Sequence, residues 1–318
     1  MLSFIVIGRN EGWKLTKCLQ SVYETIEHNK LTKYEVIYVD SKSTDNSIER
    51  VKFFNDIKIY LITGSCNAAI ARNIGAKESV GDTLFFIDGD MEIQPDFLSL
   101  VYHENDGLKY NFVSGQWINF NYSSDGKLLS KDEYRSENYC DKKEFTTGGL
   151  FLINREVWFS VNGMKNKMRI NEDLDIALRL VDKGIFLLRK KELLAIHHTV
   201  PYTEKTRIWK MLFSGAQLYR IVLLRENLLN KYEWKLFLRG NYTFIILIFS
   251  ILVSTIYCNP LWLLFYFGAV IMRTLLRKEK NLRLFFTNFL YFPCYELSLL
   301  FAFFLFWPTT PSIEYKVV

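Results

Sequence analysis

Two carboxylates separated by one residue follow an apolar run that ends at Ile87. The segment Phe85-Phe86-Ile87-Asp88-Gly89-Asp90 places both aspartates just beyond the end of a predicted buried strand. Divalent cations prefer oxygen ligands, and a cation held by carboxylates can neutralise the charge of a diphosphate. A tight acidic turn around Gly89 explains the same residues equally well. The motif alone therefore leaves a metal–diphosphate site and a structural turn as open alternatives.

A second acidic group, Asn171-Glu172-Asp173, stands at the start of a predicted amphipathic helix over residues 172–183. Acidic residues in a first turn usually cap the helix or interact with its dipole, and this is the commoner role of such a motif. The alternative is that Asp173 is a general base that removes a proton from an acceptor hydroxyl. Asp175, two positions on, points to another face of the helix.

A glycine pair forms the third candidate. Thr146-Thr147-Gly148-Gly149 precedes the apolar run 150–153. Paired glycines let a backbone approach a ligand closely, although they also serve in simple turns.

The elements that must position these residues follow from the hydrophobic pattern. Strands and helices are predicted to alternate up to residue 88, with the helix after residue 47 capped by Asp45. The predicted strands are 3–7, 34–39, 57–62 and 83–87, and the predicted helices are 15–26, 67–79 and a segment beginning at residue 48. This order predicts a parallel sheet with right-handed crossovers, whose ligands bind beyond the carboxyl ends of the strands. Asp40 and Asp88 both stand at such ends.

The pattern is less regular beyond residue 110. We expect a strand over 115–120, a polar loop over 119–139, and two short strands over 185–188 and 193–196. Gly184 is well placed to end the helix over 172–183. An α/β domain is thus predicted for residues 1–205.

The last third of the chain is strongly apolar. Asn241 to Met272 contains no charged residue, and this run of 32 is too long for one comfortable span of about 20 residues. Asn259-Pro260 interrupts it, which predicts a hairpin of two spans over 242–258 and 260–276. A third span is predicted over 284–307, and residues 206–240 are expected to form amphipathic interfacial helices. Residues 241–318 would then be the membrane region, with an apolar subdomain resting in the interface as the alternative.

Composition limits the setting. The formal net charge of +6 is modest, and Lys and Arg gather beside apolar runs, which favours a membrane surface over a nucleic-acid partner. The five cysteines show no paired or metal-like spacing, which is typical of a reducing compartment. Residues 1–7 are too short for the core of a signal peptide. We therefore expect a protein of the plasma (inner) membrane, with its first domain on the cytoplasmic side.

Several short motifs, in this order, resemble the family-two inverting glycosyltransferases with a GT-A fold. The segment 3–11 resembles their opening strand and Asn-Glu turn, and Val39-Asp40-Ser41-Lys42-Ser43-Thr44-Asp45 resembles their second strand end. The later matches are Ala71-Arg72-Asn73-Ile74-Gly75, Asp88-Gly89-Asp90, Gly148-Gly149 and Glu172-Asp173. The resemblance covers residues 2 to about 200, and six motifs in the correct order are far more specific than any one of them.

The resemblance implies a role for each matched residue. Asp40 would contact the nucleotide base, with Glu11 nearby, and Arg72 would lie near the diphosphate or the base. Asp88 would contact the ribose or the metal, and Asp90 would ligate Mg²⁺ or Mn²⁺. The sugar and acceptor site would be formed by Gly148, Gly149 and Glu172, beside Asp173 as the catalytic base. Some relatives use a histidine after this region, so either His197 or His198 would contact the metal or a phosphate.

Gln217-Leu218-Tyr219-Arg220 is similar to a motif of processive polysaccharide synthases, but Ile221 stands where those enzymes have tryptophan. The polar side of an interfacial helix explains it better.

The function implied is metal-dependent, inverting transfer of a sugar from a nucleotide-sugar donor. The acceptor would be membrane-proximal: a lipid-linked saccharide, a polyprenyl phosphate or a polysaccharide. Two alternatives are a nucleotidyltransferase of similar fold and a non-catalytic membrane scaffold. Gly8-Arg9-Asn10-Glu11-Gly12 differs from the glycine-rich loop that opens nucleotidyltransferases, and no G-x-G-x-x-G follows the first strand, as a dehydrogenase would require.

Overall fold

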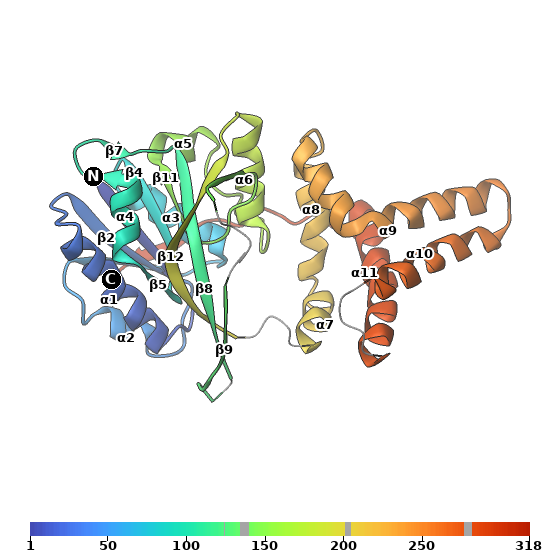
Figure 1. Ribbon diagram of the computed structural model, residues 1–318, viewed down its shortest axis with the longest axis horizontal. Coiled ribbons are helices and arrows are strands. Elements are labelled where there is room, and N and C mark those ends of the chain that lie inside the picture. The colour runs from blue at the N-terminus through green and yellow to red at the C-terminus, as the bar shows by residue number, and fades with distance from the viewer. Residues whose placement is uncertain (124, 134–139, 201–204, 277–281) are drawn as a thin grey trace. The chain divides into compact units, whose positions relative to one another are not determined.

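The computed structural model describes residues 1–123, 125–133, 140–200, 205–276 and 282–318 (Figure 1). The chain divides into two compact units. Unit 1 comprises Met1–Tyr202 together with Thr309–Val318, and unit 2 comprises Thr203–Pro308. Unit 1 contains a large mixed sheet with helices on both faces, whereas unit 2 is helical.

Four parallel strands form one half of the sheet, as predicted. They lie in the order β3-β2-β1-β4, with the bounds β1 (Leu2–Gly8), β2 (Tyr34–Asp40), β3 (Ile57–Ile62) and β4 (Thr83–Asp88). The register pairs Gly8 of β1 with Asp40 on one side and Ile7 with Asp88 on the other. Both aspartates therefore end their strands at the same edge of the sheet.

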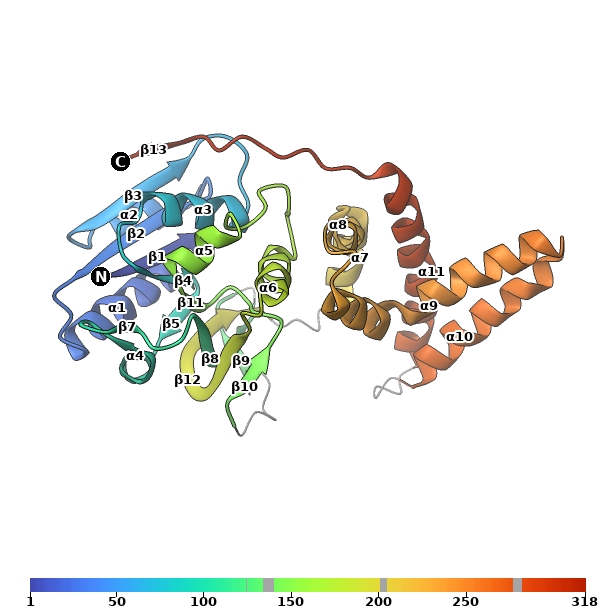
Figure 2. The same cartoon turned by 90° about the horizontal axis from the view of Figure 1, so that it is seen from above.

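Helices cover both faces of this half (Figure 2). One face packs against α1 (Trp13–His28), α2 (Ser47–Val51) and α4 (Pro95–Val101), and the other against α3 (Ala68–Glu78), α5 (Arg155–Ser160) and α6 (Glu172–Asp182). Because helices cover both faces, the parallel strands read as continuous apolar runs. Gly75 of α3 lies so close to β1 that an added Cβ would come within 2.2 Å of Ile5, which explains the small residue there.

The N-terminal caps differ slightly from the prediction. Asn67 caps α3 by accepting a hydrogen bond from the backbone N–H of Ile70. For α2 the capping position is Asn46, one residue after the predicted Asp45. The side chain of Asp45 accepts a hydrogen bond from the backbone N–H of Ser47.

Antiparallel and mixed pairing extends the sheet beyond β4. The strands here are β5 (Met91–Ile93), β8 (Phe112–Tyr122), β9 (Leu128–Glu133), β10 (Lys142–Glu144), β11 (Phe151–Asn154) and β12 (Leu187–Thr199), while β6 (Tyr102–His103) and β7 (Gly107–Leu108) form a separate pair. The two short strands predicted over 185–188 and 193–196 are parts of one long strand, β12. Its pairing with β8 is irregular between Arg189 and Leu193, where the two predicted strands were separated.

The predicted polar loop over 119–139 is wrong for the part that the structure describes. β8 continues to Tyr122, and β9 returns along it as a hairpin. Every residue of β9 is exposed, so the strand has no buried face to produce an alternating pattern. Residues 124 and 134–139 of this predicted loop lie outside the described residues.

The end of the chain also belongs to unit 1. Residues 309–318 fall within the range predicted as the membrane region, but β13 (Tyr315–Val317) pairs antiparallel with β3 (Figure 2). The Tyr315 hydroxyl donates to Glu78 at 2.6 Å and accepts from Lys77 at 2.9 Å. Backbone pairing fixes this three-residue strand, which is too short to show a period in sequence.

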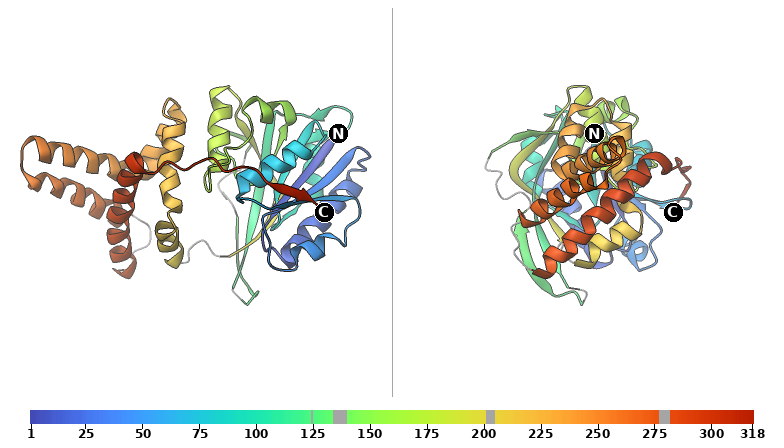
Figure 3. Two further views of the ribbon diagram at one scale, coloured as in Figure 1. Left: turned by 180° about the vertical axis from the view of Figure 1, so that it is seen from behind. Right: turned by 90° about the vertical axis from the view of Figure 1, so that its right-hand side faces the viewer.

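Unit 2 consists of helices (Figure 3). Aromatic and aliphatic side chains form its core. Its elements are α7 (Lys205–Phe213), η1 (Ala216–Leu218), α8 (Tyr219–Glu226), α9 (Lys231–Ile256), η2 (Pro260–Trp262), α10 (Leu263–Leu275) and α11 (Leu282–Leu305). By length and composition alone, two helices of the described chain could cross a membrane, Lys231–Ile256 and Phe285–Leu305. The segment predicted as the second of three spans is shorter, Pro260–Leu275. The predicted turn at Asn259-Pro260 is present, and residues 277–281, between the second and third predicted spans, lie outside the described residues.

Candidate active site

Arg72 of α3 links the end of β4 to the start of α6. Its guanidinium, 1% exposed, donates to a carboxylate oxygen of Asp88, to Glu172 at 3.2 Å and to the carbonyl of Gly149 at 3.3 Å. Three residues singled out in the sequence thus meet at the buried cation of a fourth, Arg72. Because its guanidinium is buried, Arg72 is better placed to hold Asp88 and Glu172 in position than to contact a nucleotide-sugar directly, which is the role that the resemblance implies.

Charge and burial act on the acidic groups around Arg72 in opposite directions. Burial raises the pKa of Asp88 by more than the Arg72 charge lowers it. Burial and the charge of Asp173 together raise the pKa of Glu172 to about 7, despite Arg72. Burial likewise raises the pKa of Asp173, against the opposing charge of Arg72. Glu172 and Asp173 are therefore a coupled pair that takes up a proton more readily than ordinary carboxylates.

Asp90 faces His197 across the turn that follows β4. The Asp90 Oδ2 atom lies 3.2 Å from His197 Nε2 and 4.0 Å from Lys14 Nζ, and Lys14 also pairs with Glu11 at 2.6 Å. Burial raises the pKa of Asp90, but the hydrogen bond and charge of His197 and the charge of Lys14 outweigh it, so this pKa lies below its ordinary value. Burial and the charge of Asp90 raise the pKa of Glu11.

The two candidate histidines have different surroundings. His197 Nδ1 is 2.9 Å from Asn119 Oδ1, which orients its Nε2 toward Asp90. His198 is 1% exposed and lies 2.8 Å from Glu92 and 3.0 Å from the Tyr122 hydroxyl. The geometry therefore places His197, and not His198, beside the predicted metal ligand. The backbone N–H of His198 still donates to the carbonyl of Asp90 at 2.9 Å, so β12 is tied to this turn.

The glycine pair Gly148-Gly149 packs directly against the Arg72–Asp88 pair. Gly148 has a φ of +144°, and a Cβ at Gly149 would lie 1.9 Å from Asp88 Oδ2 and 2.7 Å from an Arg72 nitrogen. Only glycine at position 149 leaves room for the Arg72–Asp88 pair as it stands.

Arg189 is a residue of this region that the motifs did not indicate. Its buried guanidinium donates to the carbonyls of Thr147 at 3.0 Å and Gly115 at 2.9 Å, and pairs with Glu144 at 2.8 Å. It thereby holds the chain that leads into Gly148. The sequence carries no signal that singles it out, because Arg189 opens a run of four charged residues, 189–192.

A cleft of about 570 Å³ lies at this site. Its lining residues are Asp88, Asp90, Met91, Trp117, Asn119, Gly148, Gly149 and His197. Asp173 does not line the cleft, but it follows Glu172 at the start of α6, and Arg72 contacts Glu172 at 3.2 Å. Asp40 is at the same sheet edge, 1% exposed, and accepts from the backbone of Ser43 at 2.8 Å and from the Tyr38 hydroxyl at 3.0 Å.

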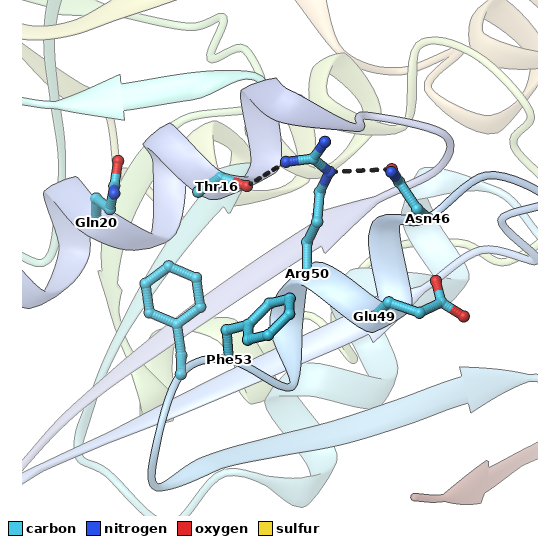
Figure 4. Close-up of a pocket in the computed structure, with 7 residues that line it drawn as sticks. Thr16, Gln20, Asn46, Glu49, Arg50 and Phe53 are labelled. Carbon is cyan, nitrogen blue, oxygen red and sulfur yellow. Dashed lines mark hydrogen bonds between the residues drawn. The ribbon is translucent and has the colours of Figure 1, made fainter.

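A second hollow of about 540 Å³ lies between α1 and α2 (Figure 4). Arg50 crosses it, donating to Asn46 at 2.9 Å and Thr16 at 3.3 Å, beside the highly exposed Phe53. Its lining includes none of the site residues predicted from sequence, so it is distinct from the cleft at the strand ends.

The cleft residues suit a divalent cation that also binds substrate. A carboxylate oxygen and an imidazole nitrogen, from Asp90 and His197, are suitable ligands for Mn²⁺, and the Asn119 contact orients the ring as outer partners of ligating histidines do. Asp88 is occupied by Arg72. Among the described residues, no group of three or more His, Cys, Asp or Glu side chains is arranged to hold a metal. Further ligands would therefore have to come from a diphosphate or water.

Comparison with known proteins decides the family. The model of glycosyl transferase family 2 matches residues 3–164, which is just over half of the chain. The chain belongs to glycosyltransferase family 2. This glycosyltransferase is 24% identical over 191 residues to an uncharacterized glycosyltransferase of Haemophilus influenzae (58% of this chain, 64% of the relative). It is 26% identical over 212 residues to glycosyltransferase AglE of Haloferax volcanii (64% of this chain, 68% of the relative).

The match thus spans slightly less than two thirds of the first relative. Among solved structures, the enzyme resembles Staphylococcus aureus TarS 1-349 with a TM-score of 0.50 and 16% identity, over 94% of this chain and 90% of that one. At this identity the likeness shows the fold alone, which is GT-A. The predicted family and the predicted GT-A fold are confirmed.

Proposed function

We propose that this glycosyltransferase moves a sugar from a nucleotide-sugar donor to a membrane-proximal acceptor by a single, inverting displacement. In this proposal Asp173 is the base, and Asp90 and His197 hold Mg²⁺ or Mn²⁺. The observation that carries the proposal is the Arg72 bridge, because it joins the Asp88–Asp90 turn to the helix start that bears Asp173.

The donor would bind along the carboxyl edge of the sheet. Asp40 already accepts two hydrogen bonds there, so its position is fixed before a nucleotide base arrives. Asp88 would be held by Arg72 for a contact to the ribose. A divalent cation, when bound, would neutralise the charge that builds on the leaving nucleoside diphosphate.

Asp173 would accept the proton of the acceptor hydroxyl as that oxygen attacks the anomeric carbon. Its Oδ1 accepts from the backbone N–H of Leu174 at 2.8 Å, which fixes the side chain at the start of α6. Burial raises its pKa, and a raised pKa makes a carboxylate a stronger proton acceptor. The charge of Arg72 opposes this shift in the pKa and favours the anionic form of Asp173.

A membrane-proximal acceptor is proposed from unit 2. Its helices expose many large apolar side chains, including Phe249, Phe265 and Leu276, and two of its helices have the length to span a bilayer. Polyprenyl phosphates, lipid-linked saccharides and nascent polysaccharides are all acceptors that such a location would serve. Cytoplasmic orientation at the plasma (inner) membrane remains a prediction from the sequence.

The test is a screen of the purified enzyme with Mn²⁺ against UDP-, GDP- and dTDP-sugars, with release of nucleoside diphosphate as the readout. With the donor that turns over, Asp90→Asn should abolish both donor hydrolysis and transfer. Asp173→Asn should abolish transfer yet largely retain donor binding. Asp96→Asn, which changes an exposed carboxylate of α4, is the matched control. Normal transfer by Asp173→Asn would refute the base assignment.

A further inference from the structure

The outward face of α9 changes character along its length. Lys231, Lys235 and Arg239 are exposed at intervals of four residues, which places them on one side of the helix. The opposite side is buried, with Glu233 paired to Arg220 and Phe237 in the core of unit 2. We call these three cations the basic row.

An apolar face begins where the basic row ends. Its exposed members lie three or four residues apart: Tyr242 (39% exposed), Ile245 (37%), Phe249 (65%), Leu252 (55%) and Ile256 (72%). Side chains at this spacing share one face of a helix. Water is a poor environment for such a continuous apolar surface, whereas the hydrocarbon of a bilayer accepts it.

A fixed bend separates the two segments. Asn241 has non-helical dihedral angles, and its side chain donates to the carbonyl of Phe237 at 3.2 Å and accepts from the Tyr295 hydroxyl at 3.0 Å. Arg273 lies in the last turn of α10, which forms a hairpin with α9, and it donates to the carbonyl of Gly240 at 2.6 Å. The backbone groups released by the bend are thus partnered, so the change of direction is part of the fold.

The charge of Arg273 is balanced within unit 2 because it pairs with the buried Glu296 at 2.9 Å. The three side chains of the basic row are exposed: Arg239 lies within one turn of Tyr242, the first member of the apolar face, and Lys235 and Lys231 lie one and two turns further back. A cation within one turn of a membrane-inserted segment lies at the depth of the lipid headgroups, and cations further out are still attracted within about one Debye length, roughly 10 Å at 0.1 M salt.

Building on the membrane location proposed above, we propose that the basic row binds the phosphates of anionic lipids at the base of the α9–α10 hairpin. The apolar face selects a lipid partner over a nucleic acid or an acidic protein, because neither of those would cover it. The enzyme would consequently concentrate anionic lipid around unit 2, whatever sugar it transfers.

The experiment uses the full chain reconstituted into phosphatidylcholine vesicles that contain trace spin-labelled phosphatidylglycerol or phosphatidylcholine. Electron paramagnetic resonance then measures how much of each label the protein immobilises. From about a fivefold effect per basic residue, we expect a clear preference for phosphatidylglycerol, of at least about fivefold at 0.1 M salt. It should fall to within about twofold at 1 M salt, where the Debye length is about 3 Å.

The variant Lys231→Gln/Lys235→Gln/Arg239→Gln should lose the preference while still immobilising phosphatidylcholine. Its matched control is Lys30→Gln/Lys33→Gln/Lys52→Gln, which removes three exposed cations from unit 1 and should retain the preference. Equal immobilisation of both lipids by the wild type, or an unchanged preference in the first variant, would overturn the lipid proposal but leave the membrane location standing. Immobilisation of neither lipid would overturn both.

Discussion

Gly149→Ala should uncouple the site without altering any ionisable group. The added Cβ would lie 1.9 Å from Asp88 Oδ2, while real Cβ contacts almost never fall below 3.0 Å. The carboxylate or the backbone must therefore move by about 1 Å, and Asp88 must give up its present bond to Arg72. A misplacement of about 1 Å at a reacting centre costs on the order of 100-fold in rate. We expect kcat/KM for sugar transfer to fall by about that factor, or about 2.7 kcal/mol of transition-state stabilisation.

Stability should change much less than activity. Asp88 is partly exposed and can turn toward water, so we expect a loss of about 1–2 kcal/mol in the free energy of unfolding. Gly107→Ala is the control, because Gly107 also has a positive φ, +75°, but nothing lies within 4 Å of its added Cβ. That variant should have a lower Tm, because alanine is strained at this positive φ, and it should transfer sugar at the wild-type rate. Wild-type kcat/KM in Gly149→Ala would show that the Arg72–Asp88 geometry does not matter for catalysis.

Three further predictions concern the surroundings of the site. Asn119→Ala should remove the hydrogen bond that orients His197, so Mn²⁺ affinity, measured by competition with a chelating dye, should fall about 10-fold; unchanged affinity would show that this contact does not support the proposed metal site. The raised pKa of Glu172, about 7 against an ordinary 4.5, means that the folded state holds more protons between these values, so stability declines as pH rises from about 5 to 7. Glu172→Gln should remove up to about 3 kcal/mol of this decline in urea titrations, and parallel pH profiles would contradict it. Deleting residues 309–318 should lower the Tm of unit 1 by several degrees, because β3 loses its partner strand; an unchanged Tm would mean that β13 adds no stability.

The parallel half of the fold was predictable because its signals are local. Buried strands such as 83–87 read as apolar runs, and the helix residues from Leu15 to Ile26 recur at helical spacing. Strand ends in a parallel sheet share an edge, so Asp40 and Asp88 could be placed together before any coordinates were known. The strands that the sequence did not predict are those that pair without a hydrophobic pattern. The exposed strand β9 and the short β13 are held by backbone hydrogen bonds, which sequence periodicity does not report.

The site shows the same division. The motifs named Asp90, but they left two histidines open, because neighbours on a strand look alike in sequence and point to opposite faces. The structure separates them through their partners, Asn119 for His197 and Glu92 for His198. Arg72 was identified by its motif, yet its burial and its three acceptors depend on segments far apart in the chain.

The environments of the carboxyl groups divide the work that the proposed reaction requires. His197 and Lys14 hold the pKa of Asp90 below its ordinary value, which suits a residue that must remain anionic beside a cation and a diphosphate. Burial raises the pKa of Asp173, which suits a residue that must take up a proton. Carboxyl groups whose environments push their pKa values apart are a common mark of distinct catalytic roles. Arg72 joins Asp88 to Glu172, which stand beside these two groups in the chain, so a change that releases it should disturb donor binding and proton transfer together.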